Sequence, residues 1–154
     1  MTTIVTDGQT IAADGMRTWN GELRGLSFQK LTVRGNRIFA YCGSTPLMGP
    51  VIDWFEAGAD PKAMPPHGDP DWTLLIIDSM GLRKASYVCA FPETFNYPFA
   101  IGAGGDYALG AVWAGATPRR AIELVSQHTS HTGGEIQVIN IADVVGASLK
   151  EAAE

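Results

Sequence analysis

The chain has 154 residues, enough for a single domain over residues 1–154 that buries roughly 70% of the surface exposed in its unfolded form. Its formal net charge of −5 and its 11 scattered Lys and Arg residues argue against a nucleic-acid partner, because phosphate binding depends on clustered cations. No segment reads as a leader peptide or approaches the ~20 apolar residues that cross a bilayer, so we expect a cytoplasmic protein with no membrane partner.

The chain is predicted to open with a hairpin of two strands joined by Asp7-Gly8, since Asp-Gly between alternating segments is the strongest short-range hairpin signal. A two-residue loop at this point would pair Thr2 with Ala13. The carboxylate of Asp14 would then lie beside the beginning of the chain.

Thr2 is a candidate nucleophile, because an N-terminal threonine carries a hydroxyl and a basic amine on one residue. We expect Met1 to be removed, since threonine is a small second residue. The freed amine has a reference pKa of about 7.7–8.0, and a neighbouring cation would lower it further. The alternative is an ordinary chain start whose first strand simply joins a sheet.

A second hairpin is predicted with Gly35-Asn36 at its tip. A two-residue loop there would extend the strand pairing as far as Phe28 opposite Gly43. Lys30 would then lie toward the same end of the hairpin as Gly43.

The remaining pattern alternates strands and helices around a stiff loop at residues 60–71, which contains four prolines. Strands are predicted at residues 2–6, 9–13, 28–34, 37–42, 72–78, 84–90, 99–101 and 136–141, and residues 91–98 are predicted to be irregular. Helices are predicted from Ser44 to Gly58, at residues 106–114 and 117–128, and weakly at the C-terminus. Helices gathered after antiparallel hairpins predict an α+β fold of sheets flanked by helical layers.

Four stretches bring Thr2, Asp14, Lys30 and Gly43 into one region of the predicted hairpins. They are Thr2-Thr3-Ile4-Val5, Ile11-Ala12-Ala13-Asp14-Gly15, Lys30-Leu31-Thr32 and Gly43-Ser44. Together with the glycine-rich turn inside residues 100–108, they resemble the N-terminal-nucleophile hydrolases, specifically proteasome β-subunits and the peptidase HslV, in a divergent bacterial or phage form.

This resemblance implies a four-layer αββα sandwich of two antiparallel sheets, with the proline-rich loop in place of the family's second long helix. It also implies acyl transfer by the hydroxyl of Thr2, whose α-amine takes the proton. Lys30 would hold the pKa of that amine low, Asp14 would hold Lys30, and the backbone N–H of Gly43 would stabilise the oxyanion. By the same resemblance, Thr18 binds the substrate backbone and Tyr41 shapes the specificity pocket.

The chain departs from the family pattern at four positions that support the terminal amine. Ala103 and Gly105 stand where family members have serines, and Thr129 and Thr132 correspond to an aspartate and a serine. The glycine-rich turn could instead hold a phosphate, but it lacks the third glycine of a dinucleotide motif.

No cofactor or metal is expected, because His128 and His131 have ligand-like spacing without a third ligand close by. Cys42 and Cys89 lie in apolar strand-like segments and are expected to be small core residues. Charged residues make up 18% of the chain against a typical ~25%, which hints that other subunits cover part of the surface.

The leading functional hypothesis is a threonine-type endopeptidase that acts on peptides or unfolded proteins within a homo-oligomeric ring, with an unfoldase ATPase as a possible partner. The alternative is a catalytically silent scaffold or assembly subunit, and a more distant option is a small-molecule amidohydrolase. The peptidase hypothesis depends on the predicted pairing of the opening strands and on the ε-nitrogen of Lys30 lying near the mature amino end.

Overall fold

The computed structural model describes residues 1–146 of the chain, which form two main sheets, a small hairpin and several helices. The strands are β1 (Thr3–Thr6), β2 (Thr10–Ala13), β3 (Arg17–Trp19), β4 (Glu22–Gly25), β5 (Leu31–Arg34), β6 (Arg37–Cys42), β7 (Thr73–Asp78), β8 (Gly81–Ser86), β9 (Glu93–Phe95), β10 (Phe99–Gly102) and β11 (Gln137–Asn140). The helices are α1 (Met48–Glu56), α2 (Gly105–Trp113) and α3 (Pro118–His128), with short 3-10 helices at Thr45–Leu47 and Pro61–Ala63. Residues 141–146 are also helical, and the rest of the predicted C-terminal helix lies outside the described residues.

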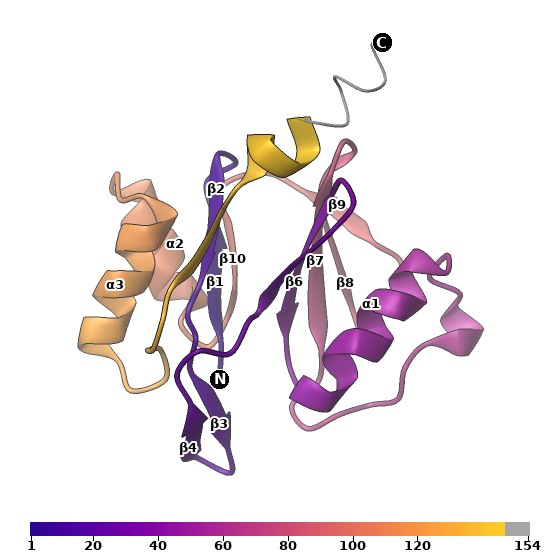
Figure 1. The fold of residues 1–154 in the computed structure, drawn as a ribbon, viewed down its shortest axis with the longest axis horizontal. Helices are drawn as coiled ribbons and strands as arrows, with labels where there is room; N and C mark the ends of the chain where they lie inside the picture. The colour runs from indigo at the N-terminus through magenta and orange to yellow at the C-terminus, as the bar shows by residue number, and fades with distance from the viewer. Residues whose placement is uncertain (147–154) are drawn as a thin grey trace.

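The two main sheets face each other and carry helices on their outer sides (Figure 1). One sheet has the strand order β10-β1-β2-β11 and the other has the order β5-β6-β7-β8-β9, with every neighbouring pair antiparallel. Helices α2 and α3 cover the first sheet, and α1 covers the second. The predicted α+β class and four-layer αββα architecture are therefore confirmed.

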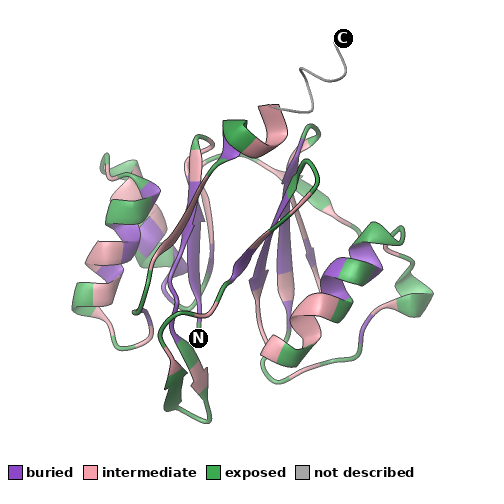
Figure 2. Ribbon diagram, viewed as in Figure 1, coloured by how far each residue is buried: buried purple, intermediate pink, exposed green. Residues whose placement is uncertain are grey.

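The central strands of the two sheets, β1 and β2 in one and β6 and β7 in the other, are buried on both faces (Figure 2). Because side chains alternate along a strand, Ile4 points into the core between the sheets while the next residue, Val5, packs under α2 and α3. In the same way Leu75 lies between the sheets and Leu74 packs under α1. Each apolar run thus supplies two layers of the core at once.

The opening hairpin forms, but its predicted register is wrong by two residues. β1 pairs Ile4 with Ala13, so a four-residue loop replaces the predicted two-residue loop. The cause is the side chain of Asp7, which accepts hydrogen bonds from the backbone N–H groups of Gln9 and Thr10 at 2.8 and 2.9 Å and widens the turn. Since the shift is even, each side chain keeps its predicted face of the sheet.

The second hairpin has the predicted two-residue loop, with Arg34 opposite Arg37. Its pairing does not extend to Phe28 opposite Gly43, which corrects the prediction. The backbone N–H of Phe28 instead donates 3.0 Å to the carbonyl of Gly15, which ties this segment to the end of the first hairpin.

Two further elements differ from the prediction. Residues 93–95 of the segment expected to be irregular form β9, which pairs with β8 and extends the second sheet. The strand expected at residues 84–90 begins and ends earlier, at Gly81–Ser86, because a two-residue turn places Gly81 directly opposite Asp78.

The hairpin β3–β4 was not predicted from the sequence. It turns at Asn20-Gly21, where both residues have positive φ of 49° and 77°, as a tight hairpin turn requires. The hairpin projects from the body of the molecule next to the N-terminus (Figure 1).

Candidate active site

Four of the predicted site residues lie one position outside a strand. Thr2 precedes β1, Asp14 follows β2, Lys30 precedes β5 and Gly43 follows β6. Both hairpins place these strand ends at the same end of the sandwich, where the two sheets meet. The topology therefore gathers residues that are up to 41 positions apart in sequence.

Lys30 and Asp14 form a buried ion pair at the centre of this region. The Nζ of Lys30 lies 2.6 Å from Oδ1 of Asp14, and the two side chains are 4% and 0% exposed. The same Asp14 oxygen accepts a 2.9 Å hydrogen bond from the backbone N–H of Thr3, and its other oxygen accepts one from Gly133 at 3.2 Å. These donors fix the carboxylate, so its position sets that of the Lys30 ammonium.

The register of the opening hairpin explains how Asp14 reaches this position. The backbone N–H of Asp14 donates 3.1 Å to the carbonyl of Thr3, so the aspartate lies opposite Thr3. The predicted register instead places Asp14 opposite Met1, beside the beginning of the chain. Asp14 therefore lies near the chain start as predicted, although the predicted pairing is wrong by two residues.

Lys30 also contacts the residue that precedes Thr2. Its Nζ donates a 3.1 Å hydrogen bond to the carbonyl oxygen of Met1. Burial lowers the pKa of Lys30, while the charge of Asp14 opposes that shift. Burial, followed by the charge of Lys30, lowers the pKa of the Met1 ammonium. An amine at this end of the chain is thus easier to deprotonate than one in water.

The Met1 ammonium donates a 3.0 Å hydrogen bond to the hydroxyl of Thr18, which lies on β3. Thr18 was expected to contact the substrate backbone, and it lies on the wall of a cleft that Met1 and Thr2 share. Thr2 itself is 7% exposed with Met1 in place. Removing Met1 would uncover both the amine of Thr2 and the side of the cleft next to Lys30.

Gly43 lies at the cleft in a backbone conformation with φ of 143°, which favours glycine. A Cβ atom at this position would lie 2.7 Å from the Cα of Trp72, so no side chain fits. The close approach of Asp71 and Trp72 therefore accounts for a glycine at this position of the cleft wall.

Tyr41 lines the same cleft but is only 2% exposed, and its hydroxyl donates a short 2.5 Å hydrogen bond to the carbonyl of Ser44. Burial raises the pKa of Tyr41. The cleft is completed by residues from β3 and just before it, the segment before β5, the first 3-10 helix and the proline-rich loop, among them Met16, Arg17, Trp19, Phe28, Thr45, Asp69 and Pro70.

Solved structures share this architecture. BPH from Thiobacillus denitrificans matches with a TM-score of 0.65 and 22% identity over 91% of this chain and 97% of that one. The same protein in complex with epoxomicin matches with a TM-score of 0.65 and 18% identity over 91% and 98%. HslV from Trypanosoma brucei matches with a TM-score of 0.65 and 15% identity over 90% and 98%. The chain has an HslV-like fold.

The comparison of sequences alone found no matching family model and no matching curated protein. At 15–22% identity the likeness to BPH and HslV is one of fold.

The glycine-rich turn of this HslV-like fold packs against β1. A Cβ atom at Gly102 would collide with the carbonyl oxygen of Thr2, and one at Gly104 would collide with the hydroxyl of Thr3 on β1. Close approach to the first strand thus accounts for these glycines, without a bound phosphate.

The two threonines expected near the terminal amine have other partners. The hydroxyl of Thr132 lies 2.6 Å from that of Thr3, and the hydroxyl of Thr129 donates 2.9 Å to the carbonyl of Val125 at the end of α3. Thr132 therefore supports the first strand through Thr3, and Thr129 belongs to the helix terminus. The ion pair of Lys30 and Asp14 is the nearest charged support for Thr2.

Cys42 lies next to the site, although the sequence predicts it to be only a core residue. It lines a hollow together with Met1, Thr2 and Gly43, and burial raises the pKa of its thiol despite a hydrogen bond with Thr2. Its position next to Gly43 in the sequence was the available signal. The high pKa keeps this thiol protonated, so it is a weak nucleophile beside Thr2.

Within residues 1–146 no three His, Cys, Asp or Glu side chains gather as a metal site would require. His131 instead stacks on Tyr107, with 6.4 Å between the ring centroids. None of the helices in this part of the chain is both long and apolar enough to cross a bilayer.

Proposed function

We propose that this protein is a threonine-type endopeptidase whose nucleophile is Thr2, exposed by removal of Met1. The observation that carries the proposal is the buried Lys30–Asp14 pair, whose ammonium lies 3.1 Å from the Met1 carbonyl and thus next to the Thr2 amide. A charged pair buried at a strand end costs desolvation energy and is a poor source of stability, so a catalytic role explains its presence.

The reaction follows from these positions. The hydroxyl oxygen of Thr2 attacks the carbonyl carbon of the peptide, and its proton passes to the α-amine of the same residue. The backbone N–H of Gly43 donates to the oxyanion that forms, an interaction worth about 2.7–4 kcal/mol of transition-state stabilisation. The C–N bond then breaks, the amine returns the proton to the leaving group, and water hydrolyses the ester on Thr2.

Lys30 acts on the base in this scheme. Its positive charge, held by Asp14, favours the neutral form of an amine at Thr2 in the same way as it lowers the pKa of the Met1 ammonium. Met1 occupies the position next to the nucleophile, so the chain with Met1 retained is expected to be inactive. We further propose that active subunits form a ring that encloses the clefts.

A catalytically silent scaffold is the second candidate. It is favoured by the partners of Thr132 and Thr129, because their hydroxyls hydrogen-bond to Thr3 and Val125 and neither bond orients a terminal amine at Thr2. On this alternative the fold serves assembly alone, and removal of Met1 has no catalytic consequence.

The two candidates are separated by assaying one preparation before and after methionine aminopeptidase treatment. Internally quenched peptides should be cleaved only after intact mass shows loss of Met1. Thr2→Ala should abolish cleavage and Thr2→Ser should retain part of it, because serine keeps the hydroxyl and the amine. Absence of cleavage by the treated wild-type protein would favour the scaffold, and equal cleavage before treatment would contradict the proposed role of Thr2.

A further inference from the structure

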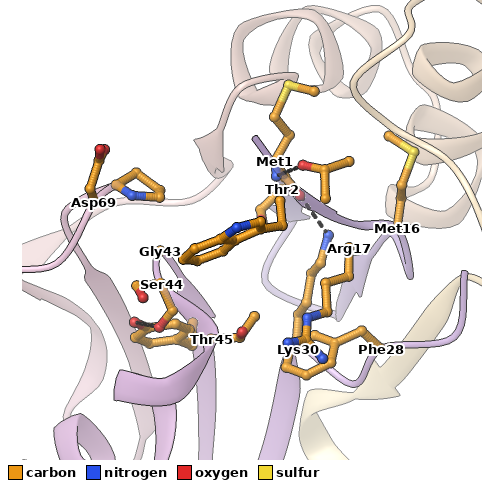
Figure 3. A pocket seen from close by; sticks show the side chains of 14 residues that line it. Met1, Thr2, Met16, Arg17, Phe28, Lys30, Gly43, Ser44, Thr45 and Asp69 are labelled. Carbon is orange, nitrogen blue, oxygen red and sulfur yellow. Dashed lines mark hydrogen bonds between the residues drawn. The ribbon is translucent and has the colours of Figure 1, made fainter. Parts of the chain in front are cut away.

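One wall of the cleft is formed by the proline-rich loop, which folds back over the end of β6. Asp69 and Pro70 line the same cleft as Thr2, and Pro70 also lines the adjoining hollow beside Ala103. Figure 3 shows Asp69 on the opposite side of Met1 from Arg17. A bound peptide that reaches Thr2 therefore passes between the loop and β3.

Residues on either side of Asp69 are held in place. Gly68 packs so closely on the 3-10 helix that a Cβ atom would lie 2.7 Å from Cδ1 of Leu47. The His67 ring nitrogen Nδ1 contacts the carboxylate of Asp71, and the ring lies 5.1 Å from that of Tyr87. The loop thus has anchors before and after Asp69, which gives its carboxylate a defined place at the rim.

The charges that line the cleft are unevenly placed. Lys30 is neutralised by Asp14 at 2.6 Å. Arg17 lies across the cleft, with its guanidinium 5.6 Å from the ring centroid of Phe28. Asp69 is exposed and makes no ion pair with any residue of the described part of the chain. The loop side of the cleft is therefore negative and the β3 side is positive.

We propose that Asp69 is a specificity-determining residue that selects peptides carrying a Lys or Arg side chain on the loop side of the cleft. This inference rests on the proposed peptidase function and names the substrate class of that site. An unpaired carboxylate at the rim attracts a cation and disfavours an anion, whereas Pro70 beside it offers an apolar surface for the methylene groups of a long basic side chain.

The test uses the protein after removal of Met1. Each peptide of the panel carries Lys, Leu or Glu at one varied position, and this position is moved over the four residues on each side of the scissile bond. At one position or two neighbouring positions, Lys should give the highest kcat/KM. Asp69→Asn should reduce the Lys-to-Leu ratio of kcat/KM about two- to fivefold, the range expected for an exposed charge pair. Asp69→Lys should invert the preference toward Glu, and high salt should weaken the wild-type preference.

Asp106→Asn is the matched control, since Asp106 is an exposed acid on α2 outside the cleft. It removes the same charge and should leave the Lys-to-Leu ratio unchanged. If Asp69→Asn and Asp106→Asn leave the same ratio while Leu peptides are still cleaved, the inference is wrong and the peptidase function stands. If wild-type protein cleaves no peptide of the panel, both the inference and the proposed function fall.

Discussion

Asp14 is fully buried, and its two carboxylate oxygens accept hydrogen bonds from three donors. Replacing it with Asn would leave the Lys30 ammonium buried without a counter-ion. Removal of one partner from a buried pair typically costs about 3–5 kcal/mol, so we expect Asp14→Asn to lower the free energy of unfolding by that amount. Urea denaturation followed by circular dichroism measures it.

The control is the surface pair of Arg24 and Glu22, which has a similar 2.7 Å contact but side chains that are 50% and 70% exposed. Glu22→Gln should change the free energy of unfolding by no more than about 1 kcal/mol. Equal losses for Asp14→Asn and Glu22→Gln would show that Lys30 does not depend on Asp14.

Because the α-amine of Thr2 is the proposed base, catalysis should depend on pH. Burial and the charge of Lys30 lower the pKa of the Met1 ammonium from 8.0, and we expect the same direction for the Thr2 amine after processing, whose neutral form alone accepts the proton of the Thr2 hydroxyl. Cleavage by the processed protein should therefore rise with pH through a midpoint below 8.0 and then level off. A profile of kcat/KM against pH checks this, and a midpoint above the ordinary amine value would contradict the role of Lys30.

At the scale of elements, the contact between β1 and the glycine-rich turn carries a stability prediction. A Cβ atom at Gly104 would lie 2.8 Å from the hydroxyl of Thr132 and 2.9 Å from Cγ1 of Val125. Overpacking of this kind typically costs 1–3 kcal/mol, so Gly104→Ala should lower the free energy of unfolding by about that much. It should also displace Thr3 and so disturb the start of the first strand.

Gly110 provides the matched comparison, because it lies inside α2 and a Cβ atom there meets nothing within 4 Å. Gly110→Ala should raise the free energy of unfolding by about 0.5–1 kcal/mol, since alanine loses less backbone entropy in a helix. Thermal unfolding of both variants measures the difference. Equal effects would mean that the turn does not press on β1 as described.

The hairpins show what could be predicted at this scale. Asp7-Gly8 and Gly35-Asn36 both mark real turns, but only the second has the predicted loop length. Loop length at the first depends on which backbone groups the Asp7 side chain binds, and this is decided by local geometry. Asn20-Gly21 is an equally strong turn signal, but the hairpin that it forms was not predicted.

At the candidate site, the proximity of the residues could be predicted from the sequence, whereas their catalytic roles stay a prediction. Thr2, Asp14, Lys30 and Gly43 do meet at one end of the sandwich. The partner of Thr132 and the presence of Asp69 on the cleft wall could not be read from the sequence. Both depend on how segments distant in sequence pack, which neither spacing nor periodicity encodes.

For the molecule as a whole, exposed apolar side chains point to self-association. Tyr107 and Trp113 on α2 are 64% and 71% exposed, and hairpin β3–β4 presents Trp19 and Leu23 at 53% and 56%. Surfaces of this kind commonly mark contacts with other chains. We expect sedimentation analysis to show a closed oligomer at micromolar concentration. Full peptidase activity from a monomer would contradict the proposed ring.

The account depends most on the claim that the processed terminus reacts as a nucleophile under the influence of Lys30. Incubation of the processed protein with a peptide epoxyketone or vinyl sulfone, followed by mass mapping, tests this claim directly. We expect one adduct, located on Thr2. It should be lost in Thr2→Ala and strongly reduced in Lys30→Met. Processed, folded wild-type protein without an adduct, or an adduct that forms equally in Lys30→Met, would contradict it.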